Sequence, residues 1–221
     1  MDVLLIGCGR MGSAMARGWE GRHHVFVHDP AVECLPPGVE RVASLDGFEG
    51  SGEGELAIVL AVKPQIFASL AGALKPFGAR GALAVSIMAG ISLATLGDVL
   101  GARVVRAMPN TPAAIGKGIT AAVAGAGIGV RDREAVDALL APTGELVWIE
   151  DEAQIDAVTA VSGSGPAYFF RFTEALARAG ADAGLPSVLA MKLARATFSG
   201  AAALAGADPA DLAELRRQVT S

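Results

Sequence analysis

A glycine-rich turn near the start of the chain limits the possible fold more than any other feature. Four apolar residues, 3–6, lead into the sequence GCGRMG, and an alanine-rich segment with helical spacing follows. A strand, a turn with G-x-G-x-x-G spacing and a helix begin the βαβ unit that binds dinucleotides. There the first glycine makes the turn, the second lets the backbone approach a pyrophosphate, and the third lets helix and strand pack closely.

The helix that follows such a turn offers unpaired N–H groups and a partial positive charge to phosphates. The sequence therefore predicts contacts to a dinucleotide from Gly7, Cys8, Gly9, Arg10, Met11 and Gly12. The same pattern also fits an ordinary strand–turn–helix whose glycines serve the turn alone.

Composition excludes several classes of partner and location. The chain has 221 residues, of which 52% are hydrophobic and 19% charged, enough to bury a sizeable core. A net charge of −5 without basic clusters predicts no nucleic acid and no membrane as partner. No apolar run reaches the length of a membrane span, and no signal peptide precedes the first strand. The two cysteines, Cys8 and Cys34, do not indicate a disulfide framework, so we expect a cytoplasmic protein.

Apolar runs suited to buried strands alternate with helical patterns through the first two thirds of the chain. This alternation predicts an α/β domain over residues 1–150, with a Rossmann-type, mainly parallel sheet. Further strands are expected at residues 24–29, 56–62, 82–87, 104–108, 119–124 and 146–149, with a short one near 39–42.

Two polar residues stand at the ends of predicted strands. Asp29 stands near the spacing at which an acid bonds the adenosine ribose 2′-OH, which would favour NADH over NADPH. Asp29-Pro30 is equally well explained as a turn, and one residue could serve both purposes. Lys63 ends a buried strand, at the sheet edge where doubly wound folds bind ligands, although a solvated lysine capping a strand explains its position as well.

Strands cease after residue 150, and the rest of the chain is predicted to be helical. The expected helices at 167–183 and 186–205 are apolar on nearly all sides, which requires burial. So short a region cannot bury them alone. We therefore expect residues 151–221 to form an all-α dimerisation domain that pairs with a second copy of the chain.

The chain shows no arrangement for nucleophilic or metal chemistry. Its three histidines gather at the second predicted strand, and no serine–histidine–acid set is visible. Cysteines and histidines lack metal-ligand spacing, so we expect no metal. The segment SGSGP could grip an anion through backbone N–H groups at a helix start, or could simply interrupt a helix with Ser164 as N-cap.

Several stretches together resemble the pyrroline-5-carboxylate reductases. They are IGCGRMG, AVKPQ at 61–65, VSIMAGIS at 85–92, RAMPNTPAAIGKGIT at 106–120 and DAVTAVSGSGPAY at 156–168. The resemblance implies reduction of Δ1-pyrroline-5-carboxylate to L-proline by hydride from NADPH or NADH. It also implies a Rossmann-type domain, a helical domain that interlocks with a partner, and assembly as a homodimer or a larger homo-oligomer.

The resemblance further assigns residues to the two halves of a site. It places the nicotinamide half of the cofactor against Ala61, Val62, Lys63, Pro64, Met88 and Ala89. It places the substrate against Glu152, Ser162, Gly163, Ser164, Gly165 and Pro166. Relatives that prefer NADPH often carry a small polar residue at the position of Asp29, so the resemblance leaves the cofactor open. No side chain is assigned a catalytic role, because reduction of a protonated imine depends mainly on orientation of the reactants.

The resemblance is incomplete at the end of the sequence. The family pattern continues past the equivalent of Ser221 with a Pro-Gly-Gly-Thr loop that binds the substrate, and the sequence stops before that loop. Two alternatives therefore accompany the reductase hypothesis. One is a dinucleotide-binding oligomer without turnover. The other is a reductase like the β-hydroxyacid dehydrogenases, whose acid is a lysine on the first inter-domain helix. Residues 156–161 contain no lysine, and Lys192 lies on a later helix.

Overall fold

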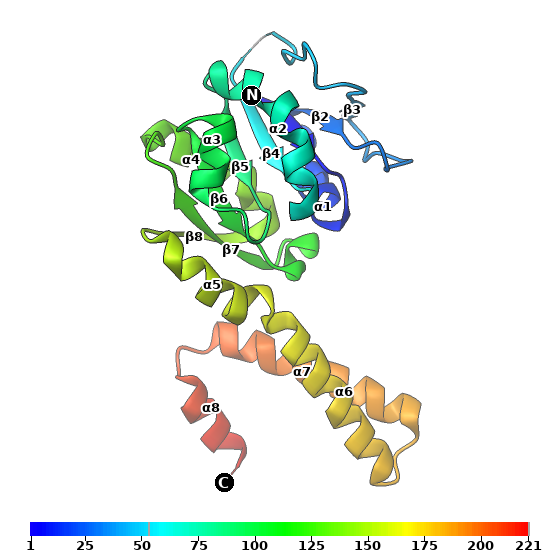
Figure 1. Ribbon diagram of the computed structural model, residues 1–221. Helices are drawn as coiled ribbons and strands as arrows, with labels where there is room; N and C mark the ends of the chain where they lie inside the picture. Colours follow the sequence, from blue (N-terminus) through cyan, green and yellow to red (C-terminus); the bar gives the residue numbers. More distant parts are fainter. Residues whose placement is uncertain (53, 221) are drawn as a thin grey trace. The chain divides into compact units, whose positions relative to one another are not determined.

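The computed structural model describes residues 1–52 and 54–220 and divides into two compact units, Met1–Ser164 and Gly165–Ser221 (Figure 1). The sequence places the domain boundary after residue 150, where strands end, but the first compact unit continues to Ser164. The reason is packing of the segment after the last strand, formed by η3 (Glu152–Gln154), α5 (Ile155–Val158) and the π-helix η4 (Thr159–Gly163). Its Ile155 is fully buried against Met108 and Val123 of the sheet.

Eight strands form a single sheet in the described part of the first unit, in the order β3-β2-β1-β4-β5-β6-β7-β8. Neighbouring strands are parallel except β6 and β7, which confirms the predicted mainly parallel sheet. The strands are β1 (Asp2–Ile6), β2 (His24–His28), β3 (Val39–Arg41), β4 (Leu56–Leu60), β5 (Leu83–Ser86), β6 (Val104–Met108), β7 (Gly118–Ala124) and β8 (Gly144–Ile149).

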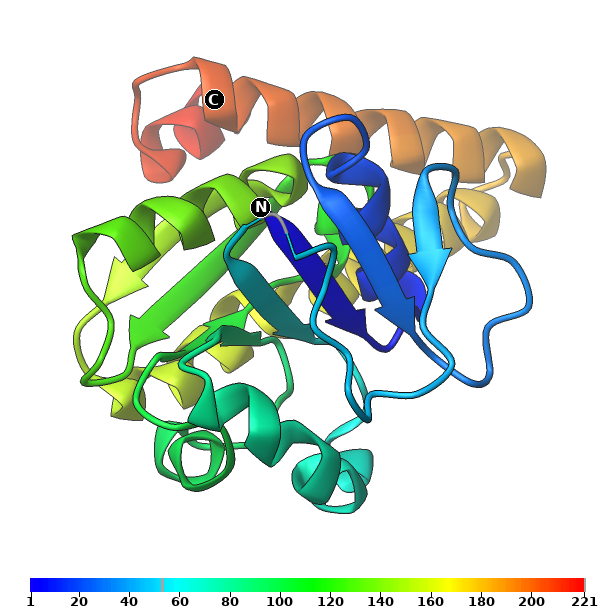
Figure 2. The same cartoon turned by 90° about the horizontal axis from the view of Figure 1, so that it is seen from above.

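Helices cover both faces of this sheet, which is why its central strands are continuous apolar runs. On one face α1 (Arg10–Gly18) and α4 (Val130–Leu140) bury a core that includes Trp19 and Leu139. On the other face lie α2 (Pro64–Ala79) and α3 (Leu93–Leu100), drawn in cyan to green in Figure 2. They bury Phe77 and Leu96 against the sheet. The short 3₁₀ turns η1 (Thr111–Ile115) and η2 (Ala141–Thr143) complete the unit.

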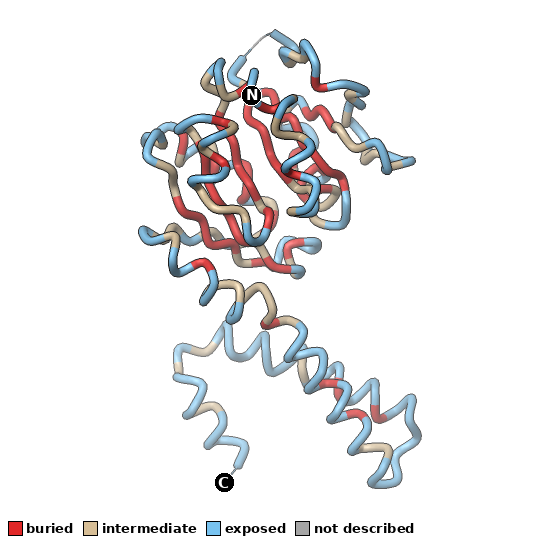
Figure 3. The backbone as a smooth tube through the Cα atoms, viewed as in Figure 1, coloured by how far each residue is buried: buried red, intermediate tan, exposed pale blue. Residues whose placement is uncertain are grey.

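The second unit consists of three helices, α6 (Gly165–Asp182), α7 (Ser187–Ala207) and α8 (Leu212–Val219), in which α6 packs against α7. Few of its residues are buried within one chain (Figure 3). Phe172 is 67% exposed and Val188 is 85% exposed. The apolar residues expected to require burial therefore lie on the surface of the isolated chain.

Helix α7 differs from one expectation. By length and composition alone it is long and apolar enough to span a membrane, although no apolar run of that length is expected from the sequence. The difference arises because the helix carries Lys192 and Arg195, which interrupt the apolar run without removing its predominantly apolar character.

Candidate functional site

The three glycines of the first turn differ in whether the packing of the chain requires a glycine. Gly7 has φ of +95°, and a Cβ there would stand 2.8 Å from the carbonyl carbon of Ala61. A Cβ on Gly12 would overlap the carbonyl oxygen of Gly7, so both residues must be glycine for α1 to pack on β1. Gly9 is different. Its φ of −68° suits any residue, and no described atom outside Gly9 and its two chain neighbours lies within 4 Å of the position its Cβ would take. The packing of the described chain does not require glycine at this position.

The open space at Gly9 lies at the N-terminus of α1. Gly9 is the N-cap of that helix and provides no side-chain hydrogen bond to it. The N–H groups of a first helical turn have no partner within the helix and can therefore bind an anion. The neighbouring backbone is fixed, because the Ser13 hydroxyl donates to the Cys8 carbonyl oxygen at 2.8 Å. The turn is thus rigid around a space that a pyrophosphate could enter.

Asp29 is bound to this turn. One carboxylate oxygen, Oδ2, accepts a hydrogen bond from the Cys8 N–H at 2.7 Å, and the other, Oδ1, accepts one from the Ala31 N–H at 2.9 Å. Asp29 is therefore the first residue of a turn and also part of the glycine-turn structure. Because each carboxylate oxygen can accept more than one hydrogen bond, the group can still bind a hydroxyl.

Strand register brings the other predicted cofactor segments to the same edge. Ile6 of β1 pairs with Leu60 of β4, and Leu60 pairs with Ser86 of β5, so the residues that follow these strands lie side by side. Residues 61–64 directly follow β4, and Lys63 is exposed as the N-cap of α2. After β5 the chain differs in detail, because the Met88 side chain is buried in the core while Ala89 is exposed. Of these two residues, Ala89 is the one exposed to a ligand.

Glu152 is held by two donors. Its Oε1 accepts a hydrogen bond from the Arg106 guanidinium at 2.6 Å and another from the Leu93 N–H at 2.8 Å. The Arg106 side chain is 9% exposed and that of Glu152 is 29% exposed. Sequence reasoning missed Arg106, although a charged residue in the middle of an apolar strand is a signal that could have identified it.

The SGSGP segment begins inside the π-helix. The Ser164 N–H donates to the Thr159 carbonyl oxygen at 2.8 Å, the five-residue spacing of a π turn, a local widening often found at functional sites. The Ser162 hydroxyl donates to the Val158 carbonyl oxygen at 3.0 Å, which leaves its oxygen as an acceptor. A Cβ on Gly163 would stand 3.9 Å from the Met108 sulfur, at the carboxyl end of β6.

The structure thus brings most predicted site residues to the first unit, while Gly165 and Pro166 begin α6 of the second unit. In the described residues, no group of three or more His, Cys, Asp or Glu side chains is arranged to hold a metal ion.

Comparison with known proteins assigns the family. The model of the pyrroline-5-carboxylate reductase dimerisation domain matches residues 152–221. The pyrroline-5-carboxylate reductase of Pseudomonas aeruginosa is 39% identical over 99% of this chain and 83% of its own length. That of Pisum sativum is 35% identical over 98% of this chain and 81% of its own length. The relatives are therefore longer than the 221-residue sequence.

Comparison with solved structures gives the same family. A pyrroline-5-carboxylate reductase from Coxiella burnetii matches with a TM-score of 0.85 and 28% identity, over 99% of this chain and 84% of that one. A Plasmodium falciparum pyrroline carboxylate reductase with NADP bound matches with a TM-score of 0.82, 28% identity and the same coverage. The match to a dimerisation model supports a homo-oligomer. The chain belongs to the pyrroline-5-carboxylate reductase family of oxidoreductases.

Proposed function

We propose that this chain reduces Δ1-pyrroline-5-carboxylate to L-proline with a nicotinamide dinucleotide, as the last step of proline synthesis in the cytoplasm. The observation that carries the proposal is Gly9, a glycine that packing of the chain does not require, beside the free N–H groups of α1. A side chain there would fill the space that a pyrophosphate needs. The residues present therefore fit the cofactor.

The first unit supplies the cofactor contacts of this proposal. Residues 7–12 and the N-terminus of α1 hold the pyrophosphate. Residues 61–64, Met88 and Ala89 flank the nicotinamide half, since they follow β4 and β5, the next two strands of the sheet after β1. When bound, the nicotinamide ring supplies the hydride for the reaction.

Asp29 sets the cofactor preference in this proposal. Its carboxylate is fixed by Cys8 and Ala31 beside the glycine turn. There it accepts a hydrogen bond from a ribose hydroxyl and repels a 2′-phosphate. We therefore propose NADH as the preferred cofactor over NADPH.

Glu152 and residues 162–164 of the first unit lie on the substrate side in this proposal. A cyclic imine accepts hydride readily once its ring nitrogen is protonated, and a carboxylate stabilises the resulting positive charge. Within the described contacts the Oε2 oxygen of Glu152 has no partner, so it is available for that purpose. The Ser162 oxygen can accept a further hydrogen bond. These groups bind and orient the substrate, which is the main requirement of the reaction.

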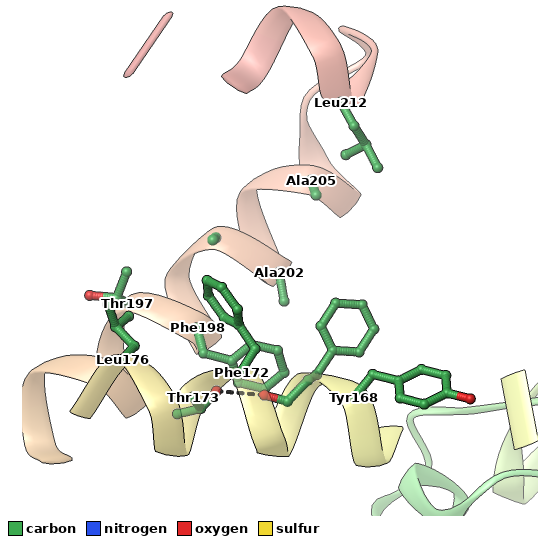
Figure 4. Close-up of a pocket in the computed structure, with 11 residues that line it drawn as sticks. Tyr168, Phe172, Thr173, Leu176, Thr197, Phe198, Ala202, Ala205 and Leu212 are labelled. Carbon is green, nitrogen blue, oxygen red and sulfur yellow. Dashed lines mark hydrogen bonds between the residues drawn. The ribbon is translucent and has the colours of Figure 1, made fainter. Parts of the chain in front are cut away.

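The second unit forms the homodimer contact in this proposal, and larger assemblies of such dimers are compatible with it. Aromatic and aliphatic side chains of α6, α7 and α8 line an open groove of about 760 Å³, with Tyr168, Phe172 and Phe198 among them (Figure 4). A second copy that covers this groove gives the exposed aromatic residues the burial they lack in one chain. The same contact explains the apolar character of α7 without a membrane.

An absorbance assay tests the proposal. NADH and NADPH are each mixed with the chain, with and without pyrroline-5-carboxylate, and nucleotide binding is followed separately by fluorescence. We expect substrate-dependent loss of absorbance, faster with NADH. Binding without turnover would support a non-catalytic oligomer.

A further inference from the structure

Arg106 is a buried cation whose presence stability alone explains poorly. It lies in the middle of β6, its side chain is 9% exposed, and its Nε is buried without a hydrogen-bond partner. Within the described residues, its only ion pair is with Glu152. The free energy lost when two charges are removed from water is about as large as the attraction gained between them in a buried pair. An ion pair of this kind is therefore weak evidence for a stabilising role.

The partner of Arg106 connects two parts of the proposed site. Glu152 Oε1 accepts hydrogen bonds from the Arg106 guanidinium and from the N–H of Leu93, which is the first residue of α3. The segment before α3 contains Ala89, which flanks the nicotinamide half in the proposed function. Glu152 itself begins the turn that leads through α5 to Ser162. One carboxylate oxygen therefore joins the cofactor side and the substrate side to β6, an interior strand of the sheet.

We propose that Arg106 is a positioning residue for the reductase reaction. It holds the Glu152 carboxylate between α3 and η3, which fixes the spacing of the two sides and leaves Oε2 for the substrate's positively charged ring nitrogen. Arg106 itself, buried beneath the carboxylate, does not contact the substrate. The inference rests on the proposed function.

Substitutions at both residues test this arrangement. Arg106→Met removes the charge at similar volume, Arg106→Lys keeps it, and Glu152→Gln keeps an acceptor for Leu93. Arg103→Met is the matched control, since Arg103 lies just before the same strand and pairs instead with Asp132 and Glu55. The readouts are kcat and KM for pyrroline-5-carboxylate, the Kd of NADH, the emission of bound NADH and the thermal midpoint.

We expect Arg106→Met to lower kcat/KM for the substrate about tenfold or more, because small misplacements of reactants are costly. The Kd of NADH should stay within about threefold, while the emission of bound NADH shifts as the segment before α3 loses its anchor. Arg106→Lys should recover part of the loss. Combining Arg106→Met with Glu152→Gln should cost no more than the worse single change. Arg103→Met should lower the thermal midpoint and leave kcat/KM unchanged.

Unchanged kcat/KM in Arg106→Met would overturn the inference, as would losses that multiply in the double variant. If Arg106→Met fails to fold, the inference is tested with Arg106→Lys and with the double variant Arg106→Met/Glu152→Gln. Neither of these leaves an isolated buried charge. A wild-type chain with no turnover would contradict both the proposed function and this inference. If the wild type turns over and the Arg106→Met variant has the same kcat/KM, the inference about Arg106 is wrong and the proposed function stands.

Discussion

The carboxylate of Asp29 accepts the backbone N–H of Cys8 at 2.7 Å, which fixes the end of β2 to the turn that follows β1. The bond makes Asp29 both a structural residue and a fixed negative charge at the position expected for the adenosine ribose. A substitution that separates these two roles is therefore more informative than one that removes both.

Asp29→Asn removes the charge and keeps one oxygen acceptor for the turn. We expect NADPH to bind about tenfold more tightly to this variant, a gain of about 1.4 kcal/mol, because the repulsion of the 2′-phosphate is gone. NADH affinity should change much less. Fluorescence titration with both nucleotides measures the ratio, and Asp29→Ala, which loses the acceptor as well, reports the structural part. An unchanged NADH-to-NADPH ratio in Asp29→Asn would contradict the assigned role.

Gly9→Ala and Gly12→Ala separate a ligand requirement from a packing requirement. The Gly9 change meets no described atom beyond its chain neighbours, so the free energy of unfolding should stay within about 0.5 kcal/mol of the wild-type value. Nucleotide affinity should fall at least about tenfold, since the new methyl group occupies the proposed pyrophosphate space. Gly12→Ala pushes α1 from β1 and should cost about 1–3 kcal/mol of stability. Full nucleotide affinity in Gly9→Ala would show that this space is not used.

Asp132 gives a prediction about acid stability. The hydrogen bond from Arg103 lowers the pKa of the Asp132 carboxyl below its usual value, helped by the Gly129 N–H, while burial acts in the opposite direction. Because the folded-state pKa lies below the unfolded one, the group stabilises the protein above about pH 4, and this contribution disappears as the pH falls through the folded-state pKa.

Asp132→Asn should therefore lower stability near neutral pH by about 1–2 kcal/mol. The gap between variant and wild type should close in acid, which thermal unfolding from neutral pH to below pH 3 would measure. A gap that is constant over this range would mean that the hydrogen-bond geometry matters and the charge does not.

Phe172→Glu tests the contact between chains. Phe172 is 67% exposed in the described groove, and burying a charge in its place at a dimer contact is costly. We expect light scattering after gel filtration to show a smaller mass than the wild type. Glu174→Gln is the control, because Glu174 is exposed on the same helix and pairs only with Arg171 in the described contacts. Equal masses for Phe172→Glu and wild type would place the contact elsewhere.

Local patterns predicted the sheet and its first turn well. The apolar runs at 3–6 and 56–62 indicate β1 and β4, and even the short strand near 39–42 is present as β3. These features follow from spacing along the chain and from the glycines, so a single sequence contains the information. The position of Asp29 beside the turn likewise follows from the adjacency of β1 and β2.

Contacts between distant residues were not predictable in this way. Arg106 and Glu152 are 46 positions apart, and their pairing depends on how the segment after β8 folds back onto the sheet. The same packing explains why the first compact unit extends past residue 150, since Ile155 becomes part of its core. The exposed face of α7 shows a related limit, because the composition of one helix does not distinguish a protein partner from a membrane.

The open apolar face of α6 and α7 has a consequence for how the protein reaches its native state. If each chain leaves these residues exposed until another chain covers them, completing the second unit and meeting a partner become one bimolecular event. Stability then depends on protein concentration by mass action, and dilution weakens the fold without any change in sequence. For such a chain, the amount present is itself a determinant of how much of it is folded.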